Sequence, residues 1–245
     1  MRGYVSRPLH LLDLDPELAE DLPPDRLEAA RAELLCRVVA WPQGAQTELL
    51  APADEAGTLG LLLVEGLVTR RVDVAGRRCV ELLAPGDLLR PWQDDGDHIV
   101  APIQPSLTAL EPVRLAVLDR QVALRLARWP ELMATLLART MRRSRALAGN
   151  LALAQVPRVE DRLLVLLWHL ADRFGKVTPE GVVVHLKLSH ELLGALIGAQ
   201  RPTVTMALGP LAERGLVRRR ADRCWVLFGD PPDLPAVLEP AAAGR

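Results

Sequence analysis

Polar and basic side chains suited to anion recognition cluster around residue 200. Gln200, Arg201, Thr203 and Thr205 supply one guanidinium and several neutral hydrogen-bonding groups. An arginine can donate two parallel hydrogen bonds to a phosphate or to a guanine edge, and hydroxyl and amide groups donate to phosphate oxygens. The chemistry that these residue types support is therefore recognition of nucleic acid.

Two short helices joined by a tight turn are predicted to position these side chains. Leucine and isoleucine recur at helical spacing over residues 192–197, which marks one apolar face. Gly198 follows where a left-handed residue would end that helix, and a second helix is predicted to begin near Gln200 with Pro202 in its first turn. This pattern is typical of a helix-turn-helix, whose second helix lies in the DNA major groove. An ordinary helical hairpin with a solvated arginine face is the alternative interpretation.

A basic segment follows the second predicted helix. Arg218 and Arg220 belong to a run of arginines that precedes an apolar stretch over residues 224–228. Two short strands joined at residues 221–222 would form a wing whose arginines reach DNA phosphates. The sequence therefore predicts a winged helix-turn-helix domain over residues 158–228.

Charge is distributed unevenly along the 245 residues. Residues 1–118 carry 11 basic against 19 acidic residues, whereas residues 119–157 carry 7 against 2 and residues 158–228 carry 11 against 7. Hydrophobic residues make up 49% of the chain, enough for a packed core, which argues against wholesale disorder. An acidic first half followed by a basic second half is typical of a sensor joined to a DNA-binding domain.

The first half of the chain predicts a helical lead-in followed by a small β domain. Residues 1–44 are expected to be the lead-in, with one helix over residues 25–39. Short apolar runs separated by Gly and Pro predict the strands of an antiparallel β-roll over residues 45–118. The predicted strands are 59–64, 67–74, 79–83 and 113–118.

Helices dominate the next segment, so the predicted fold class is α+β. Residues 119–157 are expected to form a linker and a long dimerisation helix, and Asp119 is a candidate N-cap. Another helix is predicted over residues 158–174. Residues 229–245 are rich in Pro and Ala and are expected to form a flexible tail.

The long helix contains a seam whose members alternate steps of four and three residues. Two-stranded coiled coils have a seam of that period. A protein that binds a two-fold-symmetric DNA site also needs a second copy of itself, one for each half-site. A single long helix packed on its own β domain is the alternative. The predicted dimer seam is Met133, Leu137, Thr140, Ser144, Leu147, Leu151 and Ala154.

The order β-roll, long helix, winged helix-turn-helix resembles the CRP/FNR family of bacterial transcription regulators. The resemblance is most specific over residues 190–217, with a Gly after the first helix, an Arg, a Thr-Val pair and a closing Gly-Leu. It extends to residues 160–175 and to the Pro-Gly-Asp turn at 85–87, and it covers residues 45–228 in all. It implies a sequence-specific transcription regulator that binds a palindromic operator as a homodimer. A β-roll signalling module whose winged helix binds a protein partner is the alternative.

The resemblance also implies roles for individual residues. Arg201 falls on the family's base-reading arginine, and His190, Gln200, Thr203 and Arg220 fall on positions that contact phosphate. Two further base-reading positions of the family fall on Pro202 and Met206, whose side chains cannot hydrogen-bond a base edge. The chain is therefore expected to recognise an operator sequence different from the one that those two residues read in the family.

The sensor half departs further from the family's cyclic-nucleotide-binding members. Those members hold the cyclic phosphate with a Gly-Glu turn and an Arg-Ser pair, and the Arg-Ser pair falls here on Pro102-Ile103. Cyclic AMP is therefore disfavoured, and the effector stays unidentified. Gly86, Asp87 and Arg143 are the candidate residues of an effector pocket.

The other cofactors of the family are disfavoured as well. Cys36, Cys79 and Cys224 are dispersed, and three cysteines cannot supply the four ligands of an iron–sulfur cluster. Haem would need an axial ligand such as Cys79 or His98, each of which stands alone. No metal-ligand spacing and no catalytic motif occurs, so neither a metal site nor an enzyme is expected.

The expected partners are double-stranded DNA and a second copy of the chain, with RNA polymerase as a further candidate. The chain has no apolar run long enough for a membrane span and no signal-peptide pattern at Met1. A cytoplasmic location and no membrane partner are therefore expected.

Overall fold

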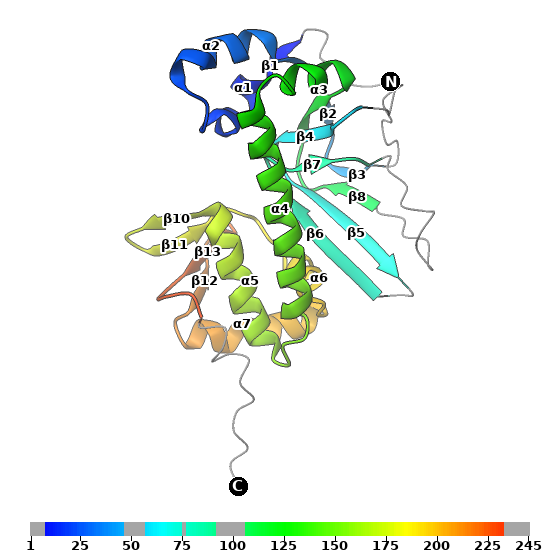
Figure 1. Cartoon of the computed structure of the whole chain (residues 1–245). Helices are drawn as coiled ribbons and strands as arrows, with labels where there is room; N and C mark the ends of the chain where they lie inside the picture. The colour runs from blue at the N-terminus through cyan, green and yellow to red at the C-terminus, as the bar shows by residue number, and fades with distance from the viewer. Residues whose placement is uncertain (1–7, 47–56, 75–76, 92–105, 233–245) are drawn as a thin grey trace. The chain divides into compact units, whose positions relative to one another are not determined.

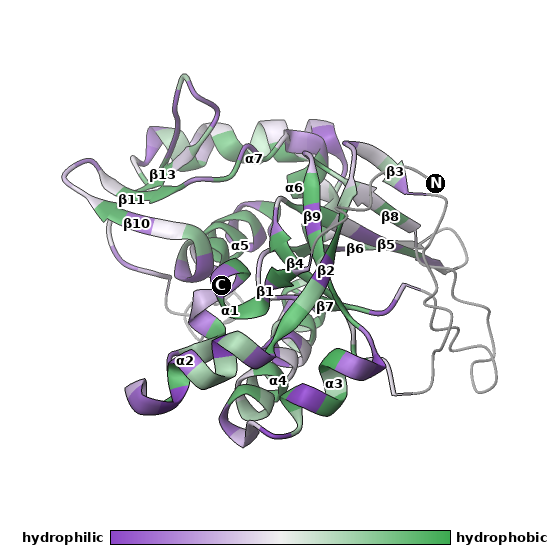
Figure 2. Cartoon of the chain, turned by 90° about the horizontal axis from the view of Figure 1, so that it is seen from above, coloured by the Kyte–Doolittle hydropathy of each residue, from purple (hydrophilic) through white to green (hydrophobic). Residues whose placement is uncertain are grey.

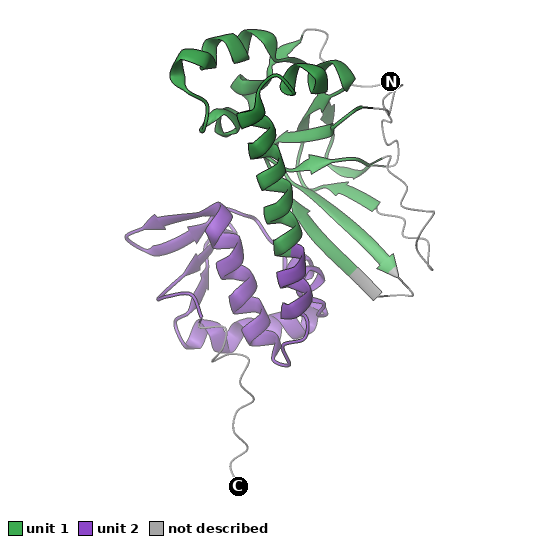
Figure 3. Ribbon diagram, viewed as in Figure 1, with its two compact units in different colours: residues 1–146 green, residues 147–245 purple. Residues whose placement is uncertain are grey.

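The structure is a computed structural model that describes residues 8–46, 57–74, 77–91 and 106–232. The chain divides into two compact units, residues 1–146 and 147–245, which are coloured separately in Figure 3. The division lies inside the long helix α4, Pro130–Leu153.

The first unit contains two antiparallel sheets (Figure 1). One sheet has the strand order β1-β2-β9-β4-β7, and the other has the order β3-β8-β5-β6. The strands are β1 (Leu9–His10), β2 (Leu35–Trp41), β3 (Gly44–Gln46), β4 (Gly60–Glu65), β5 (Val68–Val74), β6 (Arg77–Leu83), β7 (Leu88–Leu89), β8 (Ser106–Ala109) and β9 (Val113–Leu118). The predicted β-roll is therefore present.

Strand β9 shows how the core of this unit is divided. Val113, Leu115 and Val117 pack with apolar residues of both sheets, whereas Ala116 and Leu118 pack in a second cluster with residues of the helices. Since successive side chains of a strand point to opposite faces, a strand buried on both faces reads as an apolar run. Neighbouring β4 has the same character and is strongly hydrophobic in Figure 2.

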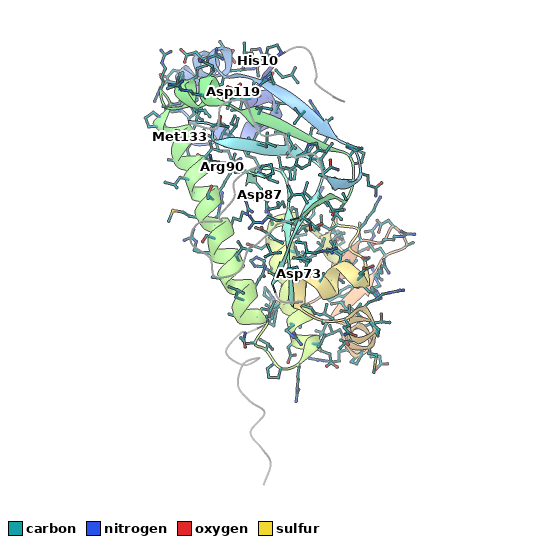
Figure 4. The ribbon with its side chains drawn as sticks, turned by 90° about the vertical axis from the view of Figure 1, so that its right-hand side faces the viewer. His10, Asp73, Asp87, Arg90, Asp119 and Met133 are labelled. Carbon is teal, nitrogen blue, oxygen red and sulfur yellow. The ribbon has the colours of Figure 1, made fainter. Side chains whose placement is uncertain are left out.

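Helices cover the second cluster. They are α1 (Leu11–Leu14), a 3-10 turn at Pro16–Ala19, α2 (Pro24–Glu33), α3 (Arg120–Leu126) and the start of α4. Asp119 caps α3, because its carboxylate accepts hydrogen bonds from the backbone N–H groups of Gln121 and Val122 at 3.0 and 3.1 Å. Figure 4 labels Asp119, and the predicted cap is confirmed.

Residues 35–41 depart from the helical lead-in that was expected over residues 1–44, whereas residues 24–33 are helical. The helix predicted over residues 25–39 ends at Glu33, and residues 35–41 form β2, which pairs with β9 from Arg37↔Val117 to Trp41↔Val113. β-branched residues pack well on a pleated surface, and here pairing with a strand far along the sequence outweighs the helical spacing of the leucines. The strands at residues 35–41 and 44–46 therefore belong to the sheets of the β-roll.

The second unit combines three helices with a small antiparallel sheet. The helices are α5 (Val159–Phe174), α6 (His190–Ile197) and α7 (Arg201–Glu213). The sheet has the order β10-β11-β13-β12, formed by Gly175–Thr178, Gly181–Val184, Trp225–Leu227 and Val217–Arg219 respectively. This arrangement confirms the predicted winged helix-turn-helix fold. Across the described residues, no helix combines the length and hydrophobicity that crossing a bilayer requires.

Candidate nucleic-acid interface

Helix α6 is capped at its start by Ser189 and ends at the predicted Gly198. The Ser189 hydroxyl accepts a hydrogen bond from the backbone N–H of Leu192 at 3.1 Å, which satisfies a free donor of the first turn. Gly198 ends the helix in the left-handed conformation, with φ +67° and ψ +35°. A Cβ atom at Gly198 would meet no neighbour within 4 Å, so glycine is required there by the backbone angles alone.

Gly194 has a different purpose, which the sequence pattern did not reveal. A Cβ atom on Gly194 would lie 2.5 Å from the carbonyl oxygen of Ala199 and 3.3 Å from Cγ2 of Val204. The missing side chain lets the turn and the following helix approach α6. Gly194 therefore sets how closely α6 and α7 pack.

Helix α7 separates a buried face from an exposed one. Val204, Leu208 and Leu211 are buried, whereas Arg201 and Thr203 are exposed at its first turn. Gln200 precedes the helix, and its side chain makes no capping hydrogen bond. Pro210 lies inside the helix, which nevertheless continues to Glu213. The first turn of α7 therefore exposes polar side chains on the face of the helix that is not packed against the domain.

A hydrogen-bonded link joins α6 to α7. Thr205 Oγ1 lies 3.0 Å from the carbonyl oxygen of Arg201, to which it donates, and 2.9 Å from Nδ1 of His190. Because a hydroxyl has one proton, His190 Nδ1 must carry the proton and donate to Thr205. Burial, together with the charges of Arg219 and Arg201, lowers the pKa of His190 below its usual 6.5. These effects favour the neutral imidazole, whose Nε2 atom is an acceptor when Nδ1 carries the proton.

The predicted wing is a hairpin of β12 and β13, paired from Val217↔Leu227 to Arg219↔Trp225. Its turn closes where the backbone N–H of Arg220 donates to the carbonyl oxygen of Cys224 at 2.9 Å. The Asp222 carboxylate accepts a hydrogen bond from the backbone N–H of Cys224, and this bond lowers the pKa of Asp222.

The arginines of the wing are not equivalent. The guanidinium groups of Arg218 and Arg220 lie 3.3 and 3.5 Å from the carboxylate of Glu180, which stands in the turn between β10 and β11. Arg219 instead places its guanidinium 5.6 Å from the ring centroid of Trp225. Arg219 was not among the contacts predicted from the sequence, which were Arg218 and Arg220, although the alternation of side chains along a strand separates Arg219 from Arg218.

The three candidate effector residues also lie together in the first unit. Gly86 adopts φ +90°, and a Cβ atom there would lie 3.3 Å from Nη1 of Arg139. Asp87, labelled in Figure 4, is buried and accepts a hydrogen bond from the backbone N–H of Ala84 at 2.8 Å. Arg143 on α4 approaches the same turn, because it donates to the carbonyl oxygen of Leu88 at 2.7 Å.

Arg143 is already engaged by a carboxylate of the β-roll. Its Nε and Nη2 atoms lie 2.5 and 2.9 Å from the two oxygens of Glu81 on β6, in the bidentate arrangement that binds most strongly. Glu81 also lies 3.0 Å from Nε of Arg70. The guanidinium that could attract an anionic effector is therefore neutralised within the chain. Pro102, Ile103 and His98 lie outside the described residues.

Most of the predicted dimer seam is exposed on α4. Leu137 and Leu151 are 61% and 66% exposed, and Thr140 and Ser144 are exposed between them. Met133, labelled in Figure 4, is half-buried and packs in its own unit, and Ala154 lies just beyond the helix. Met141, which the seam did not include, is 55% exposed.

Comparison with known proteins agrees with this geometry. Residues 161–235 match the Crp-like helix-turn-helix domain. The CRP-like cAMP-activated global transcriptional regulator of Mycobacterium tuberculosis is 31% identical over 206 residues, which cover 77% of this chain and 89% of that protein. The global nitrogen regulator of Synechococcus elongatus is 39% identical over 66 residues, 27% of this chain and 30% of that protein.

Solved structures support the same assignment at the level of the fold. A CooA mutant from Carboxydothermus hydrogenoformans has a TM-score of 0.64 at 17% identity, covering 91% of this chain and 93% of that one. FixK2 from Bradyrhizobium japonicum has a TM-score of 0.59 at 19% identity, covering 86% and 100%. This chain belongs to the CRP/FNR family and is a transcription regulator with a helix-turn-helix DNA-binding domain.

Proposed function

We propose that this regulator binds a palindromic DNA operator as a homodimer and reads one base of each half-site with Arg201. The observation that carries the proposal is the division of α7, which buries Val204, Leu208 and Leu211 and exposes Arg201 and Thr203. An arginine at the first turn of a recognition helix can donate to the O6 and N7 atoms of guanine in the major groove.

Phosphate contacts set the register of the recognition helix in this proposal. Polar side chains flank Arg201 on α6, at the start of α7 and in the wing. Most of them can donate to phosphate oxygens, whereas His190 and Thr205, whose hydroxyl proton goes to the carbonyl oxygen of Arg201, can accept from a water that bridges to a phosphate. Arg218 and Arg220 must exchange Glu180 for phosphate. The proposed contacts are His190, Gln200, Thr203, Thr205, Arg218 and Arg220.

Dimerisation is proposed to involve the exposed side of α4. Leu137, Met141 and Leu151 are each more than half exposed on this helix, and exposed apolar side chains in a row are typical of a protein interface. A partner copy would place a second recognition helix on the other half of a palindrome.

We further propose that the β-roll does not bind cyclic AMP, although the name of the Mycobacterium tuberculosis relative states that cAMP activates that protein. The support is the Arg143–Glu81 pair, since a cyclic phosphate would have to displace a bidentate carboxylate to reach this guanidinium. We also propose that the protein binds neither haem nor an iron–sulfur cluster. Burial raises the pKa of Cys36 to about 11, which fits a core thiol better than a metal ligand.

The decisive experiment selects bound fragments from genomic or random DNA with the purified full-length protein. A palindromic motif would support the proposal, whereas selection of no sequence would contradict it. Affinity for the selected duplex should fall steeply with added salt, because bound phosphates release counterions. The same assay separates this function from the alternative in which the winged helix binds a protein. The proposal also includes RNA polymerase as a further partner and a cytoplasmic location.

A further inference from the structure

Three consecutive arginines of the wing lie on two different sides of β12. In the register of the hairpin, Arg218 is opposite Val226 and Arg219 is opposite Trp225. Since neighbouring residues of a strand point to opposite faces, Arg219 faces away from Arg218. The contacts agree, because Arg218 and Arg220 reach Glu180 whereas Arg219 lies against Trp225.

Arg219 lies beside the groups that link α6 to α7. The ring centroid of Trp225 is 6.1 Å from that of His190, whose Nδ1 is 2.9 Å from Thr205 Oγ1. The charges of Arg219 and Arg201 both oppose protonation of His190. We call Arg201, Thr205, His190, Trp225 and Arg219 the junction cluster. It draws on α6, α7 and both strands of the wing.

The junction cluster carries two cations that no carboxylate neutralises. Among the residues that the structure describes, neither Arg201 nor Arg219 lies within 4.0 Å of an acidic oxygen, and both side chains are exposed. Arg218 and Arg220, by contrast, share Glu180, and Arg220 also lies 3.3 Å from Asp222. A phosphate therefore meets uncompensated positive charge at Arg219 and largely neutralised charge at its two neighbours.

Trp225 also prepares Arg219 for binding. The indole ring is buried in the second unit, and a guanidinium over an aromatic face gains a cation–π interaction while the N–H groups at its edge stay free. Side-chain freedom that is already restricted is not lost on binding. We propose that Arg219 is a phosphate-binding residue that contributes more to operator affinity than Arg218 or Arg220. This inference rests on the proposed function and adds a residue to it.

The test measures binding of full-length variants to the selected operator by fluorescence anisotropy over a series of salt concentrations. Arg219→Ala should weaken binding roughly tenfold and lower the slope of log affinity against log salt by about 1. Arg218→Ala and Arg220→Ala are the comparison variants, because the proposed function places both arginines at phosphate and each variant removes one of them from the same wing. Each variant should weaken binding by less than about threefold, since the carboxylate of Glu180 already offsets part of the charge of the arginine that is removed.

Two further variants keep the result independent of folding. Arg219→Lys retains the charge without the planar stacking group and should bind with intermediate affinity. Glu180→Gln should raise affinity, because it releases Arg218 and Arg220 for phosphate. Equal affinity and equal salt slope for wild type and Arg219→Ala would overturn the inference alone. Loss of binding that is greater in Arg220→Ala would overturn it as well. A wild-type protein that binds no duplex would instead overturn the proposed function together with this inference.

Discussion

Arg201 is the side chain on which the proposed sequence reading depends. Arg201→Ala should cost about 1–3 kcal/mol of binding free energy at the cognate operator and should relax selectivity at one base position, because a bidentate contact to guanine is lost. The measurement is affinity for a set of operators that differ at single positions. Met206→Ala is the control, since Met206 is 77% exposed on the same helix and has no group that donates to a base. Unchanged selectivity in Arg201→Ala would contradict the base-reading role.

His190 gives a pH dependence whose sign follows from its lowered pKa. The unfolded chain binds a proton near pH 6.5, whereas burial and the charges of Arg219 and Arg201 oppose protonation in the folded domain. The neutral imidazole therefore contributes stability that is full above about pH 6.5 and is lost as the pH falls through the folded pKa. Denaturant unfolding at pH 7.5 and pH 5.5 should show a smaller loss in His190→Gln than in wild type. An equal loss in both proteins would contradict the pKa direction.

At the scale of elements, the turn between α6 and α7 depends on glycines for two separate reasons. Gly198→Ala should destabilise the domain by about 1–2 kcal/mol, the cost of a left-handed conformation for a residue with a Cβ atom. Gly194→Ala should cost more, because its Cβ would lie 2.5 Å from the carbonyl oxygen of Ala199. Gly149→Ala is the matched control within α4, where a Cβ meets nothing within 4 Å. It should stabilise by about 0.5–1 kcal/mol. Denaturant unfolding of the three variants checks this order.

Helix α4 is the element that tests dimerisation. Leu137→Glu together with Leu151→Glu should yield monomers that no longer bind the palindrome, because the two leucines are 61% and 66% exposed and a charge there would be buried in a dimer. Light scattering measures the oligomeric state. Leu124→Glu is the control, since Leu124 on α3 is 57% exposed outside the seam. A double variant that remains a dimer would show that α4 is not the interface.

At the scale of the whole molecule, the question is what signal reaches the DNA-binding domain. The Arg143–Glu81 pair leads us to expect no heat of binding in calorimetry with cyclic AMP, and no change in operator affinity when it is added. Glu81→Gln removes the competing charge and serves as the comparison. Saturable binding of cyclic AMP to the wild-type protein would contradict the proposal for the β-roll.

Local sequence signals predicted much of the fold. Gly and Pro bounded the strands that became β4, β5, β6 and β9, and their apolar runs followed from burial on one or both faces. The segment 35–41 was misread, because its partner β9 begins at Val113 and no local pattern contains that pairing. Similarly, Gly86, Asp87 and Arg143 were effector-pocket candidates from the sequence and remain a prediction, whereas the carboxylate of Glu81 that engages Arg143 appeared only in the structure.

The sequence by itself determined the helix-turn-helix, because its signals act within a few residues. Ser189 caps α6, Gly198 adopts the left-handed conformation that ends it, and Pro202 lies in the first turn of α7, where proline is tolerated. Only the tertiary structure decided which charges remain available to DNA. Arg218 and Arg220 meet Glu180 from another hairpin while Arg219 meets Trp225, and such encounters depend on strand register and chain folding rather than on the order of residues in one segment. Three arginines that are alike in the sequence therefore have different chemistry in the folded wing.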